Sequence, residues 1–323
     1  MPKYVTDTTE LTNLASAIRT AAGLTSSLTF NSGYINGISS IKGPLSLADF
    51  IGSVTASKIT GAFINSTVIE VASGAWGYTN ITEVSLPNCE KVNDYAFTYC
   101  RSIASMSLPQ CSYVGISAFW YNDKLTVADL PNCTFIGNSA FYQCYYLSYV
   151  NLPNLLSLDS AMYAFGLCNR LASISLPSCQ FLSRQPFYNC TSLSHIDLPE
   201  CSAIGSYGLA YTYGLQTISL PKCTSIWNRA FYSCNNLSSV SLPVCNYLGE
   251  ALFQNCYNLL SLYLMSSSIC SLTNTNAFSS TPISNYTTST GGVQGSIFVP
   301  ASLYDSYKAA TNWVTYADRF VSV

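Results

Sequence analysis

Apolar residues recur along the chain in a fixed triplet, with polar residues at most of the positions between them. Segment 193–199 has the specimen form L-x-x-I-x-L-P. The Leu-Pro pair that closes the triplet stands at Leu86 and returns every 22 residues as far as Leu242, with one step of 24 after Leu152. A period of this size marks a stack of coils, in which each coil buries its apolar face against its neighbours.

Each triplet predicts one short parallel strand, because its second and third residues point the same way. The proline removes an amide donor and therefore suits the end of a strand. The spacing matches the leucine-rich repeat template. We predict a leucine-rich repeat solenoid of about ten short parallel strands, mostly β and loop, with small helical caps at both ends. The triplets are Ile59/Ala62/Ile64, Ile81/Val84/Leu86, Ile103/Met106/Leu108, Leu125/Ala128/Leu130, Leu147/Val150/Leu152, Leu171/Ile174/Leu176, Leu193/Ile196/Leu198, Leu215/Ile218/Leu220, Leu237/Val240/Leu242 and Leu259/Leu262/Leu264.

Fourteen cysteines fall mainly into two columns, at the ninth and twentieth positions of the repeat, as in Cys201 and Cys190. The coils that lack a cysteine in one column are not the coils that lack it in the other, so disulfides within each coil would leave several cysteines unpaired. We expect buried, reduced thiols that fill space, with oxidation between adjacent coils as the alternative. The C-x₂-C spacing of structural zinc is absent. We predict no metal and no cofactor.

The second half of the coil carries an Ala-Phe pair, as in Ala96-Phe97, and some strands are followed by Ile-Gly, as in Ile136-Gly137. Together with the strand pattern, these motifs resemble the BspA-like class of bacterial leucine-rich repeats over residues 59–281. The resemblance implies a surface or adhesive protein that binds a partner. It implies no catalytic residues.

The two ends depart from the repeat. Residues 1–45 predict a helical module that opens with the capping box Asp7-x-x-Glu10. This module resembles the N-terminal part of tail-associated proteins of phages and prophages of Gram-positive bacteria, and a simple helical cap is the alternative. Residues 46–58 are expected to be a connector.

Residues 282–323 predict a C-terminal cap built from a strand and a helix. Segment 297–299, Ile-Phe-Val, is predicted to form a strand that closes the array of repeats. An apolar lid is expected from Trp313, Val314, Phe320 and Val321.

Charge is sparse, at 9% of residues with a net charge of −2. With 13 Lys+Arg against 15 Asp+Glu, no basic stripe exists to neutralise phosphates, which excludes a nucleic-acid partner. The sequence shows no secretory signal pattern and no run of 18 apolar residues, so we expect no membrane insertion. We expect a bacterial cell-surface or extracellular protein, or a component of a phage virion.

The outward-facing strand positions form a surface that we call the strand face, and we expect it to be concave. It is a field of small hydroxyl residues with a few larger candidates for binding, which are Glu83, Asp129, Tyr149, Asn151, His195, Asp197 and Tyr263. His195 is the one histidine, and with Asp197 and neighbouring serines it has the parts of a nucleophilic triad. Open parallel strands offer neither a walled pocket nor oxyanion donors.

Tyrosines and tryptophan gather around the Ala-Phe return, at one edge of the predicted stack. Such residues bring large contact area and a hydrogen-bonding tip, which suits protein or sugar partners. We call this set the aromatic row: Tyr99, Trp120, Tyr121, Tyr142, Tyr145, Tyr146, Tyr188, Tyr211, Tyr213 and Tyr232. We predict a non-enzymatic scaffold that recognises a protein or glycan. The rival hypotheses are a hydrolase centred on His195 and Asp197, and a purely structural spacer.

Overall fold

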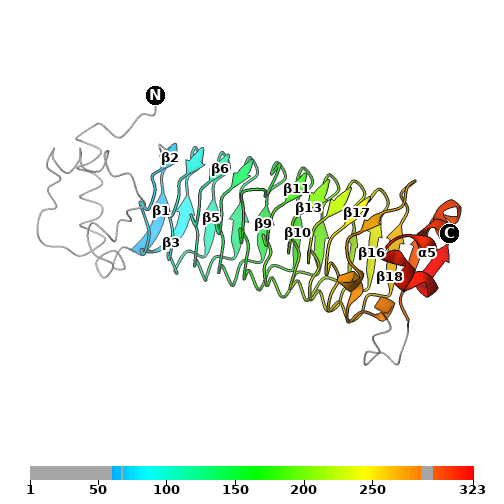
Figure 1. Ribbon diagram of the computed structural model, residues 1–323. Helices are drawn as coiled ribbons and strands as arrows, with labels where there is room; N and C mark the ends of the chain where they lie inside the picture. Colours follow the sequence, from blue (N-terminus) through cyan, green and yellow to red (C-terminus); the bar gives the residue numbers. More distant parts are fainter. Residues whose placement is uncertain (1–59, 67, 285–293) are drawn as a thin grey trace, which may run out of the picture.

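The computed structural model describes residues 60–66, 68–284 and 294–323. These residues form one elongated stack of coils that advances from β1, in blue, to the C-terminal segments, in red (Figure 1). The coils consist of short parallel strands and turns, which confirms the predicted leucine-rich repeat solenoid. The predicted module at 1–45 and the connector at 46–58 lie outside the described residues.

The longer strands of the coils form one row along the stack, which we call the long row. From the second triplet onward, each predicted triplet coincides with a strand, and equivalent residues face each other: Ile174 lies opposite Ile196, and Val240 opposite Leu262. The strands are β1 (Thr60–Ile64), β3 (Asn80–Ser85), β5 (Ser105–Ser107), β7 (Val127–Asp129), β9 (Tyr149–Asn151), β10 (Ser173–Ser175), β12 (His195–Asp197), β14 (Thr217–Ser219), β16 (Ser239–Leu242), β18 (Ser261–Leu264), β20 (Ser296–Val299) and β21 (Phe320–Ser322).

Hydrogen-bonded pairing divides the long row into three sheets, with breaks after β9 and after β12. The first break coincides with the single 24-residue step in the repeat. The strands on either side of each break remain neighbours, so the stack itself continues.

The first coil departs from the predicted triplet. Phe63, and not Ala62, lies opposite Val84, because the register shifts between Gly61 and Ala62. Gly61 adopts a φ of +96°, a conformation that glycine takes without steric cost. The shift turns the neighbours of Phe63 outward, and Ile64 is 64% exposed. The prediction that Ala62 and Ile64 face the core is therefore wrong, since a one-residue slip exchanges the two faces of a strand.

A second row of two-residue strands runs parallel to the first, and the sequence pattern does not predict it. Each strand buries one residue, as Val114 and Ile136 do opposite each other. A two-residue segment is too short to show alternation. The strands are β2 (Glu70–Val71), β4 (Lys91–Val92), β6 (Tyr113–Val114), β8 (Phe135–Ile136), β11 (Phe181–Leu182), β13 (Ala203–Ile204), β15 (Ser225–Ile226), β17 (Tyr247–Leu248) and β19 (Ser271–Leu272).

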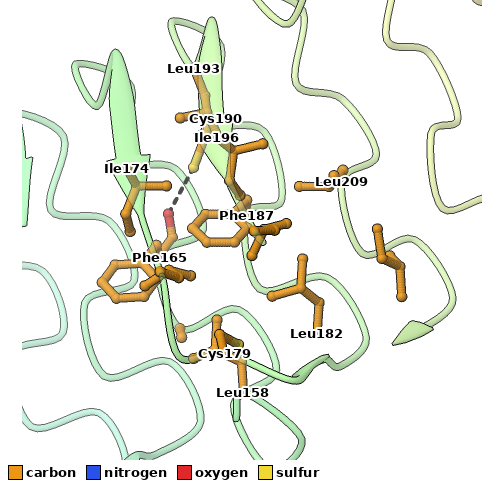
Figure 2. Packing of buried hydrophobic residues seen from close by; sticks show 14 of the residues in the cluster. Leu158, Phe165, Ile174, Cys179, Leu182, Phe187, Cys190, Leu193, Ile196 and Leu209 are labelled. Atoms are coloured by element: carbon orange, nitrogen blue, oxygen red, sulfur yellow. Dashed lines mark hydrogen bonds between the residues drawn. The ribbon is translucent and has the colours of Figure 1, made fainter. Parts of the chain in front are cut away.

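A column of phenylalanine rings runs through the core between the two rows. From Phe97 to Phe187, one ring per coil is fully buried, and successive ring centroids lie 5.2–5.6 Å apart. Figure 2 shows Phe165 and Phe187 packed among aliphatic residues of both rows. Leu209 interrupts the column, which resumes at Phe231. The rings fill the space between coils, as the Ala-Phe motif predicts.

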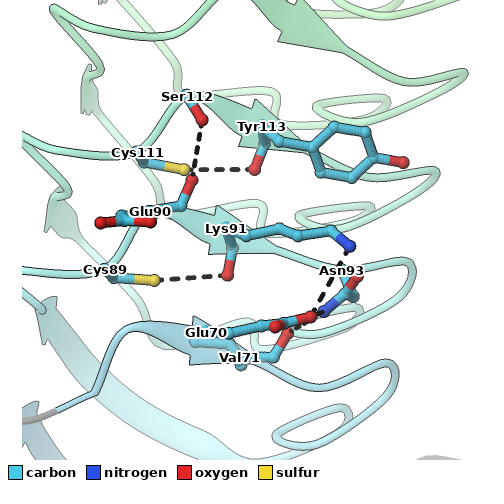
Figure 3. A network of polar contacts seen from close by, with 9 residues as sticks. All are labelled: Glu70, Val71, Cys89, Glu90, Lys91, Asn93, Cys111, Ser112 and Tyr113. Atoms are coloured by element: carbon cyan, nitrogen blue, oxygen red, sulfur yellow. Dashed lines mark hydrogen bonds and ion pairs between the residues drawn. The ribbon is translucent and has the colours of Figure 1, made fainter. Parts of the chain in front are cut away.

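All fourteen cysteines are free and buried. They do more than fill space, because most of their thiols donate hydrogen bonds to backbone carbonyls. The ninth-position thiols of Cys89 and Cys111 donate to the carbonyl two residues further on, at 3.4 and 3.2 Å (Figure 3). The twentieth-position thiol of Cys190 donates to the carbonyl of Phe165 in the preceding coil, at 3.0 Å (Figure 2). Each thiol of this second column therefore ties two coils together.

The C-terminal cap extends the long row by two strands and covers the last coil with short helices. Strand β20 matches the predicted closing strand, and the indole of Trp313 donates to the carbonyl of Cys270 at 2.6 Å. Trp313 and Phe320 are buried as expected, but Val314 and Val321 are exposed, because they lie on the solvent side of their elements. The helices of the cap are η2 (Pro282–Ser284), η3 (Ala301–Leu303), α5 (Tyr304–Ala309) and η4 (Trp313–Arg319), and η1 (Thr275–Phe278) lies in the coil return before it.

Candidate functional site

The strand face is arranged as the repeat predicts. Its candidates lie on the exposed side of five strands: Glu83 on β3, Asp129 on β7, Tyr149 and Asn151 on β9, His195 and Asp197 on β12, and Tyr263 on β18. The structure brings some of these candidates into contact. The Asn151 amide donates to the Asp129 carboxylate at 2.8 Å, and the Tyr263 ring stacks on Phe298 of β20 at 4.5 Å. Glu83 and Tyr263 lie near opposite ends of the long row.

The surroundings of His195 do not assemble a triad. The Ser175 hydroxyl lies across the strand pair from Asp197 and donates directly to its carboxylate, at 2.9 Å. A triad needs the carboxylate on the imidazole and the imidazole on the hydroxyl. Among the described residues, His195 forms no side-chain hydrogen bond to Ser175 or Asp197. The arrangement is a surface hydrogen bond beside an exposed imidazole.

The aromatic row lies along the coil returns, with its rings half-buried. One run of ring contacts joins Tyr99 to Tyr121 at 4.9 Å and Tyr121 to Tyr145 at 5.9 Å. A second run passes from Tyr142 to Tyr232 with centroid separations of 5.4–5.7 Å. The second run includes Tyr163, which sequence reasoning missed, and Tyr78 extends the first run by one ring. The predicted set therefore falls into two runs of touching rings, and among the described residues Tyr146 touches no other ring.

Backbone geometry holds the rings of the aromatic row in place. Tyr99 donates its amide to the carbonyl of Trp120 at 2.7 Å, and Tyr121 donates to Tyr142 at 2.9 Å, so each ring is carried on a bond between coils. Both tyrosines have a φ near +60°, which costs a non-glycine residue about 1–2 kcal/mol. Most returns have two residues in this conformation, such as Tyr95 and Tyr99. The regular inter-coil bonds compensate for it and orient the side chains outward.

Cations lie over several rings of the aromatic row. The Arg101 guanidinium sits 4.2 Å from the Tyr121 ring centroid, and that of Arg170 sits 4.1 Å from Tyr146. Each contact contributes about 0.5–1 kcal/mol at an exposed site. Burial, followed by the charges of neighbouring tyrosines, raises the pKa of Tyr142, so its phenol remains a neutral hydrogen-bonding group at physiological pH. The row is thus a neutral aromatic surface with cationic edges.

A shallow hollow of about 480 Å³ opens beside the second row, and sequence reasoning missed it. Its lining includes Ser183, Arg184, Tyr207, Trp227 and Arg229. One signal was available in the sequence, because Trp227 stands at the repeat position where the two adjacent coils have Gly205 and Gly249. A tryptophan among glycines at one repeat position marks a local departure from the scaffold pattern.

In residues 60–66, 68–284 and 294–323, no cluster of three or more His, Cys, Asp or Glu side chains could hold a metal ion. Within the same ranges, no helix has the length and apolar character needed to cross a bilayer. The candidate surfaces are therefore built from aromatic, hydroxyl and scattered charged side chains.

Comparison with known proteins agrees with the repeat pattern. A family model described as the BspA type leucine rich repeat region, in six copies, matches residues 54–162 and 159–284. The crystal structure of a leucine-rich repeat protein from Bacteroides ovatus is similar, with 27% identity and a TM-score of 0.55 over 65% of this chain and 56% of that chain. The chain thus spans little more than half of that protein.

Two further structures are more distant. A leucine rich cell surface protein from Faecalibacterium prausnitzii has 23% identity and a TM-score of 0.38, over 62% of this chain and 63% of its own. A leucine-rich repeat protein from Eubacterium ventriosum has 15% identity and a TM-score of 0.39, over 76% of this chain and 82% of its own. No curated protein sequence matches the chain.

Proposed function

The chain belongs to the BspA-type leucine-rich repeat family, and from this premise we propose that it is a non-catalytic recognition scaffold that binds a protein or glycan partner. The observation that carries the proposal is the aromatic row, whose touching rings are fixed by hydrogen bonds between coils. Rings that are already ordered lose little entropy on binding, so a preorganised surface gains affinity. The strand face is the second candidate surface.

The family also favours a location. BspA-like leucine-rich repeat proteins are typically surface-associated, so we propose that this chain acts at a bacterial surface. The phage-tail setting rests on the N-terminal resemblance at residues 1–45. In either setting, the surfaces available to a partner are the aromatic row and the strand face.

The contacts of Ser175 and Asp197 do not favour the rival hydrolase, because these two groups bond each other and, among the described residues, neither side chain bonds the His195 imidazole. The spacer hypothesis differs from ours in one respect, since a spacer binds nothing. Binding is therefore the measurement that separates them.

Two tyrosines provide a matched test of which surface binds. Tyr146 belongs to the aromatic row and is 45% exposed, whereas Tyr149, three residues further on, belongs to the strand face and is 55% exposed. The labelled full chain is applied to protein arrays, glycan arrays and a panel of bacterial and host cells. We expect binding that Tyr146→Ala weakens by about tenfold and that Tyr149→Ala leaves unchanged.

The reverse pattern would move the binding site to the strand face and overturn the choice of the aromatic row. Absence of binding to every array and cell type would overturn the recognition function itself and leave the spacer. Equal thermal unfolding midpoints of the two variants serve as the folding control.

A further inference from the structure

The hollow beside the second row results from small side chains at one repeat position. Along this position the chain places Asp159, Ser183, Gly205 and Trp227 in successive coils, so two small residues lie between two large ones. A Cβ added at Gly205 would lie 2.9 Å from the carbonyl oxygen of Leu182 and 2.9 Å from the carbonyl carbon of Ser183. The close backbone packing of the coils therefore excludes a side chain at Gly205, and the floor of the hollow stays open there.

Trp227 forms one wall of the hollow and is 52% exposed. No aromatic contact covers its indole among the described residues, although most rings of this chain touch another ring. An exposed indole beside a recess provides a flat apolar face together with a hydrogen-bonding edge. Such a surface suits a ring that is apolar on one face and hydroxylated at its rim, as a sugar is.

Two guanidinium groups also line the recess. Arg184 and Arg229 lie 6.0 and 5.8 Å from the ring centroid of Tyr207, one from each of two coils. In the part of the chain that the structure describes, neither forms an ion pair with a carboxylate. Asp159 is the one acidic residue in the lining, so the hollow has an excess of positive charge. Guanidinium groups recognise carboxylates through paired, charge-assisted hydrogen bonds.

The Ser183 hydroxyl supplies an independent indication of a ligand. Ser183 lines the hollow and is only 6% exposed, yet its oxygen has no hydrogen-bond partner among the described residues. A buried hydroxyl without a partner is unfavourable, so native structures rarely contain one. Rotation of this side chain toward the hollow would let a hydroxyl or carboxylate of a ligand seated there satisfy it.

We propose that this hollow binds a carboxylate-bearing sugar residue, a uronic or sialic acid, within a glycan. The sugar ring lies against Trp227, its carboxylate meets Arg184 and Arg229, and its hydroxyls meet Ser183 and Asp159. This inference rests on the proposed recognition function and names the chemistry of one ligand for it. It places that ligand at the hollow and not on the aromatic row or the strand face.

The test uses the purified full chain and defined probes. The acidic probes are 3′-sialyllactose and tetragalacturonate, and the neutral counterparts are lactose and maltotetraose, with binding measured by titration calorimetry. A glycan array with sulfated members is run in parallel. We expect an acidic probe to bind at least about tenfold more tightly than its neutral counterpart, with affinity falling as salt is raised.

Two hollow variants and one control locate the binding. Trp227→Gly installs the residue of the adjacent coils, and Arg184→Gln with Arg229→Gln removes the cations while the side chains keep much of their length. Each should lower affinity for the acidic probe by at least about tenfold. Lys124→Gln with Lys222→Gln removes the same charge away from the hollow and should leave the affinity unchanged. Thermal unfolding midpoints check folding, and the arginine variant decides the test if Trp227→Gly unfolds.

The possible results separate this inference from the recognition function. Equal binding of neutral and acidic probes, tighter binding of sulfated members, or unchanged affinity in both hollow variants would overturn the acidic-sugar site while leaving a binding scaffold. Binding to acidic peptides or proteins alone would do the same. If no probe, protein or cell is bound, both proposals fail.

Discussion

The side-chain amide of Asn122 donates a 2.9 Å hydrogen bond to the carbonyl oxygen of Phe97, in the preceding coil. Asn122 occupies a repeat position at which most coils have cysteine, and it makes the bond that Cys144 makes to Phe119 at 3.2 Å. In these coils the column places a small donor that reaches the previous coil, whereas Thr212 at the same position donates to Leu209 of its own coil. Small hydrophobic character alone does not explain the choice of cysteine, because asparagine shares the donor and not the hydrophobicity.

Exchanges at Asn122 should separate these two requirements. Asn122→Ala removes this bond and leaves the Phe97 carbonyl with only the longer bond from the Cys100 amide, at 3.4 Å, so it should lower the free energy of unfolding by about 0.5–1.5 kcal/mol. Asn122→Cys restores a donor and removes the amide oxygen Oδ1, which is buried without a partner. The cysteine variant should be at least as stable as the parent in urea unfolding. Equal losses in both variants would contradict the donor explanation.

The thiols should be unreactive in the folded chain. Burial raises the pKa of Cys190 and of Cys133 to about 12, so both remain protonated at pH 8, and the thiolate is the reactive form. A thiol-specific reagent at pH 8 should label almost none of the fourteen cysteines before unfolding and all of them in denaturant. Rapid labelling of several cysteines in the native protein would show that the coils open or that the thiols are accessible.

Alkaline pH should destabilise the fold for the same reason. The folded pKa of Cys190 lies above that of an unfolded thiol, so the unfolded chain loses its proton first. The contribution to stability is complete below about pH 8.5 and is lost as pH rises toward 12, at up to about 1.4 kcal/mol per thiol per pH unit. Urea midpoints at pH 7, 8.5 and 10 in reductant measure this. A variant with Cys144→Asn should show a shallower fall, and a slope identical to that of the parent would count against the thiols.

The positive φ of one buried alanine predicts that two alanine-to-glycine substitutions will differ in their effect on stability. Ala251 has a φ of +49°, whereas Ala230, also fully buried in a coil return, does not adopt a positive φ. Exchange to glycine removes a methyl in both cases but relieves backbone strain only at Ala251. Ala230→Gly should therefore cost about 1–2 kcal/mol more than Ala251→Gly in urea unfolding. Indistinguishable values would show that the backbone at Ala251 carries no strain.

Ser175 should not behave as a nucleophile. Its hydroxyl donates to Asp197 and not to His195, so the imidazole that acts as the base of a triad is not placed to take its proton. A fluorophosphonate probe should leave the purified chain unlabelled, and an ester panel should show no hydrolysis that His195→Ala abolishes. Labelling that disappears in Ser175→Ala would establish the hydrolase that the contacts disfavour.

The repeat predicts the long row well because every coil repeats the same three buried residues, so errors at single residues do not accumulate. The exception is the first coil, where the slip at Gly61 moves Phe63 into the place assigned to Ala62. A single coil carries too little pattern to reveal such a slip. The second row is missed for a related reason, since residues such as Tyr113 and Val114 form strands only through their neighbours.

The surfaces are less predictable than the core. Residue type and repeat position identify the aromatic row, but the contact of Tyr163 with Tyr188 depends on side-chain directions that a periodic pattern does not contain. Similarly, His195, Asp197 and Ser175 are correctly placed on one face, yet the donor and acceptor roles become visible only at atomic distances. The hollow at Trp227 required comparison of one repeat position across coils.

The ladder of amide bonds in the returns, such as Phe97 to Ala118 and Phe119 to Ala140, presents the same donors and acceptors at each step along the stack. A whole 22-residue unit can therefore be duplicated or excised by unequal recombination, and the flanking units still meet as matching partners. Such an event would change the length of the solenoid by one coil at a time. It would also place local surface features, such as the hollow around Trp227, between new neighbouring coils without a change in the packing of the core.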